Sequence, residues 1–270
     1  MSLMKRFYND RYLHIRSFTI SLVVGALLCV AAYRLHSPDF YRFHFAAWQL
    51  LLIPLGIYAG GLSAVFIHNA THDSFPTPWL NWLGGQLAGL QQLWGFMGWK
   101  LIHLVHHQYS DHTTMDPHAP LNDNFAQFIK RMFMESSAKI TERYRAHWGM
   151  GMRTHVLHKA LLVVFLGMVA CNLLFWYLAL GPAGFVFFYI PSYIANHLLF
   201  AHINYYCHPK DPATGETAPA NLTEHWYYKL ANFFWFGIYY HANHHRRPML
   251  FNPRKMTDSR SLPEEIKAAA

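Results

Sequence analysis

Histidine is concentrated in four short motifs of this chain. The spelling His-x-x-His-His occurs twice, as HLVHH at residues 103–107 and as HANHH at residues 241–245. HNATH at residues 68–72 and NYYCH at residues 204–208 are two further motifs. Imidazole is the commonest metal ligand among side chains, so the motifs predict a metal site. The candidate ligands are His68, His72, His103, His106, His107, His208, His241, His244 and His245.

The spacing within the motifs favours two metal ions. Residues i and i+4 share a helix face, so His68 and His72 can approach one ion together, and Asn204 and His208 repeat this relation. In His-x-x-His-His the last two side chains diverge by about 100° around the helix axis. We therefore expect each triplet to contact both ions, with about four or five ligands for each ion.

The residue types narrow the chemistry without naming the metal. Imidazole binds zinc, copper, iron and nickel. The three cysteines lie far apart, and none of the four motifs supplies a carboxylate ligand, so two imidazole sites suit a redox pair better than structural zinc. The motifs lack HExxH, whose glutamate would be the base of a zinc hydrolase. They also lie outside the apolar segments, whereas a metal transporter would bind its cargo within them. An intramembrane zinc hydrolase and a metal transporter are therefore remote alternatives.

The composition is that of a membrane protein. Hydrophobic residues make up 53% of the chain and charged residues only 13%, about half the share usual in soluble domains. The net charge of +8 comes from basic residues that flank apolar stretches. We expect no nucleic-acid partner, because these residues do not form a basic patch interleaved with aromatic residues. They can instead attract an acidic protein partner.

Four apolar segments predict an all-α integral membrane protein with four transmembrane helices, arranged as two hairpins. Each segment has close to the ~20 residues that cross a bilayer. The Gly181-Pro182 step divides the longest apolar stretch into two helices. The expected spans are 17–33, 48–67, 160–180 and 184–203.

The distribution of basic residues orients these spans. Lysine and arginine are enriched in the N-terminal segment, in the segment between the hairpins and in the C-terminal tail, which places all three in the cytoplasm. About thirty residues separate His72 from His103, enough for one crossing but not two. One crossing would leave HLVHH on the far side of the membrane. We therefore expect residues 79–99 to be re-entrant or interfacial.

Three carboxylates near the motifs are candidate hydrogen-bond partners of the metal-bound histidines. Such histidines usually donate their second ring N–H to a carboxylate or a carbonyl, and Asp73, Asp111 and Asp116 are close in sequence. Helix or turn capping is the alternative role for these residues. His112 and His118 lie in SDHTTMDPHAP, which reads most simply as a turn.

Two histidines of the last apolar segment are further candidates. His197 lies within the expected fourth span and His202 at its end, and ionisable groups in a membrane are often functional. Either can line a substrate channel or replace His208 as a ligand. An apolar substrate would enter between the spans, lined by aromatic residues such as Trp94, Trp99, Trp176 and Trp235.

The four motifs together resemble the membrane fatty acid desaturase-like superfamily of di-iron enzymes. Its signature is His-x3–4-His, His-x-x-His-His and His/Gln-x-x-His-His, found here at residues 68–72, 103–107 and 241–245. The Asn-x-x-x-His of acyl-CoA desaturases is similar to residues 204–208, and the resemblance runs from about residue 48 to 250. The three-residue spacing of the first motif is that of acyl-lipid desaturases and many hydroxylases.

This resemblance implies a fold and a cofactor. The expected fold is one desaturase-like domain over residues 1–270, with a cytosolic helical cap that carries a dinuclear metal site. The implied cofactors are two iron ions, with O2 as co-substrate. Asn204 would contact a metal through water. Electrons would come from a separate donor of the ferredoxin, rubredoxin or cytochrome b5 type, because the chain contains no His-Pro-Gly-Gly motif of a fused cytochrome b5.

The resemblance also implies a reaction. We expect a fatty acyl desaturase that introduces a cis double bond into an acyl-lipid or acyl-thioester substrate. A hydroxylase, ketolase, acetylenase or decarboxylase of a lipid chain is the alternative on the same scaffold. The expected location is the bacterial inner membrane rather than the endoplasmic reticulum, with the active site facing the cytoplasm.

Overall fold

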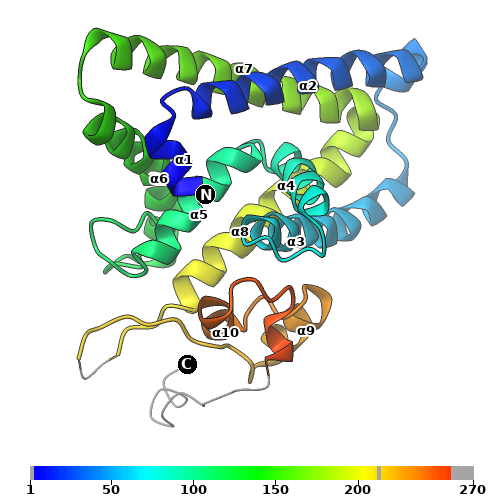
Figure 1. Ribbon diagram of the computed structural model, residues 1–270. Helices are drawn as coiled ribbons and strands as arrows, with labels where there is room; N and C mark the ends of the chain where they lie inside the picture. The colour runs from blue at the N-terminus through cyan, green and yellow to red at the C-terminus, as the bar shows by residue number, and fades with distance from the viewer. Residues whose placement is uncertain (1–2, 212–213, 257–270) are drawn as a thin grey trace.

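The computed structural model describes residues 3–211 and 214–256 (Figure 1). Across these residues the regular structure is helical, apart from two isolated β-bridges, Lys210 with Thr217 and Asn221 with Tyr240. The all-α prediction is confirmed to that extent. In chain order the helices are α1 (Leu3–Asn9), α2 (Leu13–Leu35), η1 (Pro38–Tyr41), η2 (Ala47–Leu51), α3 (Leu52–Thr71), α4 (Pro78–Gln92), α5 (Phe96–Gln108), α6 (Phe125–Trp148), α7 (Met152–Gly184), η3 (Phe185–Tyr189), α8 (Ile190–Tyr206), α9 (Trp226–Phe234), α10 (His241–Arg246) and η4 (Pro253–Lys255).

Two pairs of long helices form the frame of the molecule. Helix α2 packs along α7, and α3 packs along α8. In Figure 1 the first pair lies at the top and the second pair lies beneath it, together with α4 and α5. The short helices α9 and α10 lie on the side of α8 that faces away from α2 and α7. The frame therefore leaves the C-terminal ends of α3, α5 and α8 available to a common site.

Among the described residues, three helical stretches are long and apolar enough to cross a membrane. They are Leu13–Leu35, Ala47–Thr71 and Met152–Tyr206. The last has 55 residues, and its backbone leaves the helical conformation at Gly181, where φ is 65° and ψ is 172°. A positive φ is readily adopted by glycine alone. The Gly181-Pro182 step thus interrupts this stretch where the sequence predicted a division.

Two of the helices begin before the expected spans. α2 begins at Leu13 rather than at residue 17, and α7 begins at Met152 rather than at residue 160. The added turns carry charged side chains such as Arg16 and Lys159. Long basic side chains can continue a helix while their charged ends reach water, so hydropathy marks the apolar part of a helix and not its ends.

Residues 79–99 do not form one continuous helix. They are divided between α4 and α5, and the turn between these helices contains two left-handed residues, Leu93 (φ 66°) and Gly95 (φ 68°). α4 packs against α3, and α5 then returns HLVHH to the end of α3. There, Nε2 of His103 lies 2.9 Å from Nε2 of His72. The first two histidine motifs therefore meet, while the depth of α4 in the membrane stays a prediction.

Small residues allow α3 and α8 to approach closely. A Cβ atom added at Gly56 would collide with the carbonyl oxygen of Phe188, and one at Gly60 with that of Ser192. The amide of Asn196 donates to the Gly60 carbonyl oxygen at 3.1 Å. Glycines four residues apart are typical of tightly packed membrane helices. This contact fixes the position of the HNATH end of α3 relative to α8.

We expect Gly60→Ala to destabilise the protein by about 1–3 kcal/mol, because the added methyl group must push α3 away from the α8 backbone. Thermal unfolding in detergent micelles measures the loss. Gly167→Ala is the matched control on α7, since its Cβ would lie 3.6 Å from Leu22 side-chain carbons, an ordinary contact. Equal stability of the two variants would contradict the close α3–α8 contact.

Candidate metal centre

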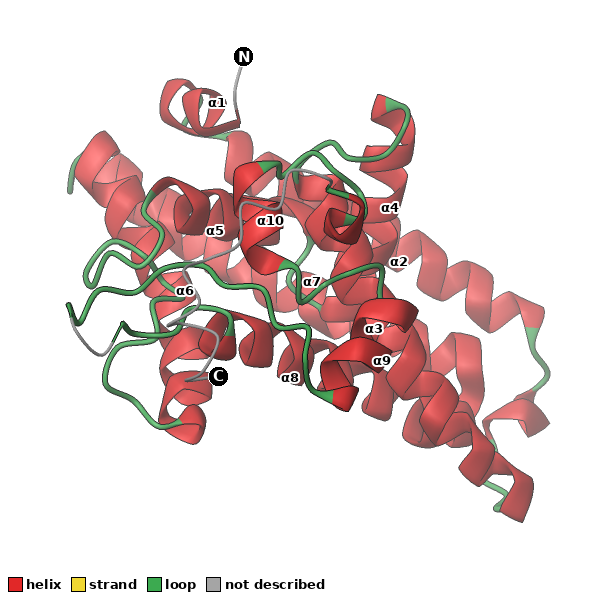
Figure 2. Ribbon diagram, turned by 90° about the horizontal axis from the view of Figure 1, so that it is seen from below, coloured by secondary structure: helices red, strands yellow, loops and turns green. Residues whose placement is uncertain are grey.

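The nine candidate histidines come from four segments that meet in space. His68 lies in the last turns of α3 and His72 directly follows that helix, while α5 carries HLVHH. His208 lies two residues beyond the end of α8, and α10 carries HANHH. Figure 2 shows α10 next to α5. All nine side chains are buried or half-buried, so the motifs form one interior site.

The first group of this site holds five imidazoles, whose ligand nitrogens all lie within 4.8 Å of one another. Nε2 of His103 lies 2.9 Å from Nε2 of His72 and 3.1 Å from that of His107. Nε2 of His244 lies 2.9 Å from Nε2 of His107. The ring centroid of His68 lies 4.0 Å from that of His244. These five rings therefore surround one small volume.

The second group holds four imidazoles within the same limit of 4.8 Å. Nε2 of His241 lies 3.0 Å from Nε2 of His208 and 3.1 Å from that of His245. The ring centroid of His106 lies 5.1 Å from that of His208 and 5.2 Å from that of His245. HLVHH and HANHH each contribute to both groups. This division is the one expected for adjacent histidines that diverge around a helix.

The nitrogen spacing suits metal ions better than hydrogen bonds. Two nitrogens bound at right angles to one ion, each at about 2.1 Å, lie about 3 Å apart. A ring nitrogen carries either a proton or a lone pair, so Nε2 of His103 cannot donate to one neighbour and accept from the other. An ion among the nitrogens would satisfy all of them together. The residues present therefore fit two metal ions.

Two carboxylates orient rings of the second group. Nδ1 of His208 lies 2.8 Å from Oδ1 of Asp111, and Nδ1 of His106 lies 2.9 Å from Oδ2 of Asp116. With Nδ1–H donating to the carboxylate, Nε2 keeps its lone pair for a metal. Nε2 of His106 is buried without a hydrogen-bond partner in the described structure. A buried ring nitrogen with a lone pair and no hydrogen-bond partner is what a metal ligand requires.

Asp116 is itself held in place by the backbone. Its carboxylate accepts the amide N–H groups of Asp111, at 2.9 Å, and of His118, at 2.8 Å. Burial acts to raise the pKa of Asp116, but the contacts with His106 and His118 outweigh burial and keep the pKa below its usual value. Asp73 does not share this role, because its carboxylate pairs with Lys100 at 3.3 Å. The prediction of a histidine partner was wrong for Asp73.

Burial favours the neutral form of several site histidines. Burial lowers the pKa of His72 to about 3 and that of His245 to about 2, and neighbouring charges act in the same direction. The pKa values of His103, His241 and His244 are also lowered, again mainly by burial. Neutral imidazole is the form that binds metal. The site is therefore ready to bind metal at neutral pH.

Asn204 and the two intramembrane histidines have separate environments. The Asn204 amide donates to the Phe200 carbonyl at 2.8 Å, and its Oδ1 is buried without a partner among the described residues. This oxygen is free to accept a hydrogen bond from a metal-bound water. His197 bonds to the Tyr193 carbonyl oxygen and His202 to the Tyr239 hydroxyl, both at 2.8 Å. Neither histidine joins a nitrogen group, whereas His208 does.

His118 lies at the site although the sequence suggested only a turn. It is 2% exposed, its ring centroid lies 5.4 Å from that of His106, and its Nδ1 has no partner in the part of the chain described. His112, in the same loop, is exposed. Asp-Pro-His carries no metal-ligand spacing, so only the packing of the loop against α5 reveals His118.

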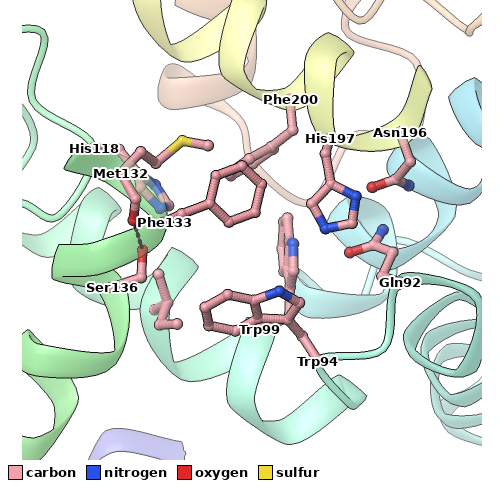
Figure 3. A pocket seen from close by; sticks show the side chains of 11 residues that line it. Gln92, Trp94, Trp99, His118, Met132, Phe133, Ser136, Asn196, His197 and Phe200 are labelled. Carbon is pink, nitrogen blue, oxygen red and sulfur yellow. Dashed lines mark hydrogen bonds between the residues drawn. The ribbon is translucent and has the colours of Figure 1, made fainter. Parts of the chain in front are cut away.

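A cavity of about 40 Å³ lies beside the nitrogen groups (Figure 3). Its walls are mainly aromatic and aliphatic, and the ring of Trp99, which lines it, stacks on His103 with centroids 4.6 Å apart. Trp94 and Trp99 line the cavity as expected, whereas Trp176 and Trp235 are not among its lining residues. None of the nine candidate ligands is among the lining residues, and Trp99 and His118 connect the cavity to them. The side chains that Figure 3 labels are Gln92, Trp94, Trp99, His118, Met132, Phe133, Ser136, Asn196, His197 and Phe200.

The profile of one protein family covers most of the chain. It is described as fatty acid desaturase and matches residues 43–254, which include all four histidine motifs. The chain belongs to the fatty acid desaturase family. The resemblance read from the motifs is thereby confirmed. The helices apolar enough for a membrane and the histidine groups are those of a membrane oxidoreductase of this family.

One curated desaturase is also similar to this chain. The sn-1 oleoyl-lipid 12-desaturase of Picosynechococcus sp. is 28% identical over 171 residues. The match covers 56% of this chain and 49% of the relative, so the match spans about half the length of the curated relative. No solved structure matches the chain.

We expect Asp116→Asn to weaken metal binding by about 10–100-fold, because the amide can neither hold the His106 tautomer nor strengthen its Nε2 as a ligand. Metal remaining after dialysis against graded chelator, measured by plasma mass spectrometry, gives the affinity. Asp39→Asn is the control, since Asp39 lies in an exposed ion pair with Arg42. Unchanged metal retention in Asp116→Asn would contradict this role.

Acidification below about pH 6.5 should destabilise the metal-free protein. The unfolded chain binds protons at its histidines near pH 6.5, whereas folded His72 and His245 do not until about pH 3 and 2. The free energy of unfolding is therefore highest above pH 6.5 and falls as the pH drops toward 3, by up to about 1.4 kcal/mol per pH unit for each histidine.

Thermal unfolding of the metal-free protein between about pH 7.5 and 5.5 measures this effect. Replacing His72 or His245 with glutamine, which does not titrate, should make the pH dependence shallower. The same substitution at His155, an exposed histidine, should leave it unchanged. A pH-independent unfolding temperature in the unsubstituted protein would contradict the neutral, buried histidine cluster.

Proposed function

We propose that this protein is an O2-dependent di-iron oxidoreductase that desaturates a fatty acyl chain, introducing a cis double bond. The observation that carries the proposal is the division of HLVHH and HANHH between two nitrogen groups beside an apolar cavity. The sn-1 oleoyl-lipid 12-desaturase activity of the relative favours desaturation, and an acyl-lipid substrate, over the other oxidations of a lipid chain.

The proposed site residues divide into two ligand sets. His68, His72, His103, His107 and His244 would hold one iron, and His106, His208, His241 and His245 the other, with Asn204 accepting from a metal-bound water. Two bound irons would supply the oxidising power, drawn from O2 and two electrons, that removes two hydrogens from unactivated methylenes. The balanced reaction converts –CH2–CH2–, O2, two electrons and two protons to –CH=CH– and two waters.

The protein supplies position and exclusion of water. The cavity brings a chain against Trp99, which stacks on the ligand His103. On the cavity wall, the side-chain amide of Asn196 donates to the Gly60 carbonyl oxygen at 3.1 Å. The side-chain amide of Gln92 donates to the Ser63 carbonyl oxygen. These amide N–H groups are therefore not offered to water, whereas Nδ1 of His118, without a partner among the described residues, remains available to a polar atom.

The proposed topology has four spans and a cytosolic helical cap. The stretch Met152–Tyr206 has 55 residues, about 80 Å of helix, whereas the hydrocarbon core is about 30 Å thick. The break at Gly181 supports two crossings, with residues 79–99 re-entrant or interfacial. Basic residues on the segments outside the spans favour a cytoplasmic site. In the proposed bacterial inner membrane, an acidic ferredoxin, rubredoxin or cytochrome b5 could deliver electrons there.

Expression in a host that supplies saturated and monounsaturated lipids tests this function. We expect new cis-unsaturated fatty acids in gas chromatography–mass spectrometry of the host lipids, and about two irons per purified chain. His244→Ala should abolish the product, at least about 100-fold, because His244 belongs to the first nitrogen group and is 2% exposed.

His112→Ala is the matched control, since His112 is exposed and belongs to neither group. It should retain the product, while membrane insertion should be normal in both variants. A hydroxylated chain in place of the alkene would select the hydroxylase alternative. Full activity of His244→Ala, or a single tightly bound zinc, would overturn the proposal.

A further inference from the structure

A second cavity lies between α2, α5, α6 and α7. Its volume is about 140 Å³. Most of its wall is apolar, with Phe18 from α2 and Leu161 and Phe165 from α7. A cavity of this size and lining can take one end of an apolar ligand.

This cavity is adjacent to the one beside the metal centre, because Trp94 and Ile102 line both and form the wall between them. Figure 3 shows Trp94 at the edge of the first cavity, beyond Trp99. A chain that extends from the second cavity to the first would have to pass Trp94 and Ile102.

The second cavity contains an imidazole whose hydrogen bonds are missing. His14 is 4% exposed, and neither of its ring nitrogens has a partner in residues 3–211 and 214–256. Its ring packs against Phe7 and Phe18, with centroids 5.5 and 5.4 Å away. A neutral imidazole has one donor and one acceptor, and buried polar groups are nearly always hydrogen-bonded. His14 is therefore suited to a polar atom of a ligand in the cavity.

The position of His14 indicates which polar atom that is. His14 is in the first turn of α2, and His158, on the same wall, is in the second turn of α7. In the proposed topology both helices begin at the cytoplasmic face, so this wall lies at the level of the lipid ester groups. His158 is already bonded to the Thr141 hydroxyl at 3.1 Å. Of the two histidines on this wall, His14 is the one whose ring nitrogens are both buried and unpaired in the described structure.

We propose that the second cavity binds the carbonyl end of the acyl substrate, with the His14 N–H donating to the ester carbonyl oxygen. The chain then runs past Trp94 to the metal centre. This assignment rests on the proposed function. It adds that His14 sets the number of carbons between the carbonyl group and the site of reaction. His14 lies outside residues 43–254, the part that matches the family, so it is a feature of this chain's own N-terminal helix.

Binding of brominated probes tests the proposal without requiring catalysis. Methyl 9,10-dibromostearate carries the ester, and 9,10-dibromooctadecane has the same chain without it; both quench tryptophan fluorescence on contact. In the purified wild-type protein in detergent we expect the ester to bind about fivefold more tightly than the hydrocarbon. Quenching should fall in Trp94→Phe, because Trp94 lines both cavities.

Two His14 variants separate hydrogen bonding from packing. His14→Leu should abolish the preference for the ester while leaving hydrocarbon binding unchanged, and His14→Gln, which keeps a donor, should retain part of it. His155→Leu makes the same change at an exposed histidine of α7 and should keep the full preference. Oleoyl-CoA or dioleoylphosphatidylglycerol should displace the ester probe, and the one that succeeds identifies the carrier of the acyl group.

Equal binding of the two probes in the wild type would overturn the proposal, as would an ester preference that survives in His14→Leu. Displacement by neither natural lipid would also overturn it. If His14→Leu does not fold, the same comparison in His14→Gln decides. An inactive wild type that keeps the His14-dependent ester preference would instead count against the desaturase function alone.

Discussion

The structure depends on burying nine imidazoles in one place without charging them. Two protonated rings whose nitrogens lie about 3 Å apart would repel strongly, and each buried charge would also lose its hydration. Burial lowers the pKa of His103 and His241, which keeps them neutral. Neutral rings with lone pairs directed at one another are stabilised by cations. Bound metal would therefore stabilise the folded state of this site, because it would supply the partners that the nitrogens lack.

The membrane-type helices serve as a rigid support for this cluster. The histidines lie at helix ends, and those ends meet because α3 and α8 are held together by glycines at their contact. α4 and α5 form a second close contact, in which a Cβ at Gly89 would lie 2.5 Å from the backbone nitrogen of Phe96. Backbone contacts of this kind leave little freedom. Ligands from four distant segments can thus keep a constant geometry.

In the proposed assignment the two cavities would divide the recognition of a substrate between shape and polarity. The wall of the first cavity includes Trp94, Trp99 and Phe200, which would hold a methylene chain mainly by contact area. Near the start of α2 the wall includes His14, whose ring nitrogens are unpaired among the described residues. An apolar tunnel cannot by itself fix where a uniform chain stops. A single polar contact at its far end can do so, because the chain carries one carbonyl group.

The sequence by itself determined the helical class, the apolar segments, the turn at Gly181-Pro182 and the nine histidines, because helix period and hydropathy are local properties. It also predicted that each triplet would be divided between two groups, since the angle between adjacent helical side chains is constant. Only the tertiary structure separated Asp116, which contacts His106, from Asp73, which pairs with Lys100. His118 and the cavity at His14 were likewise invisible in the sequence. Their environments arise from segments distant in the chain, and no local pattern encodes which segments pack together.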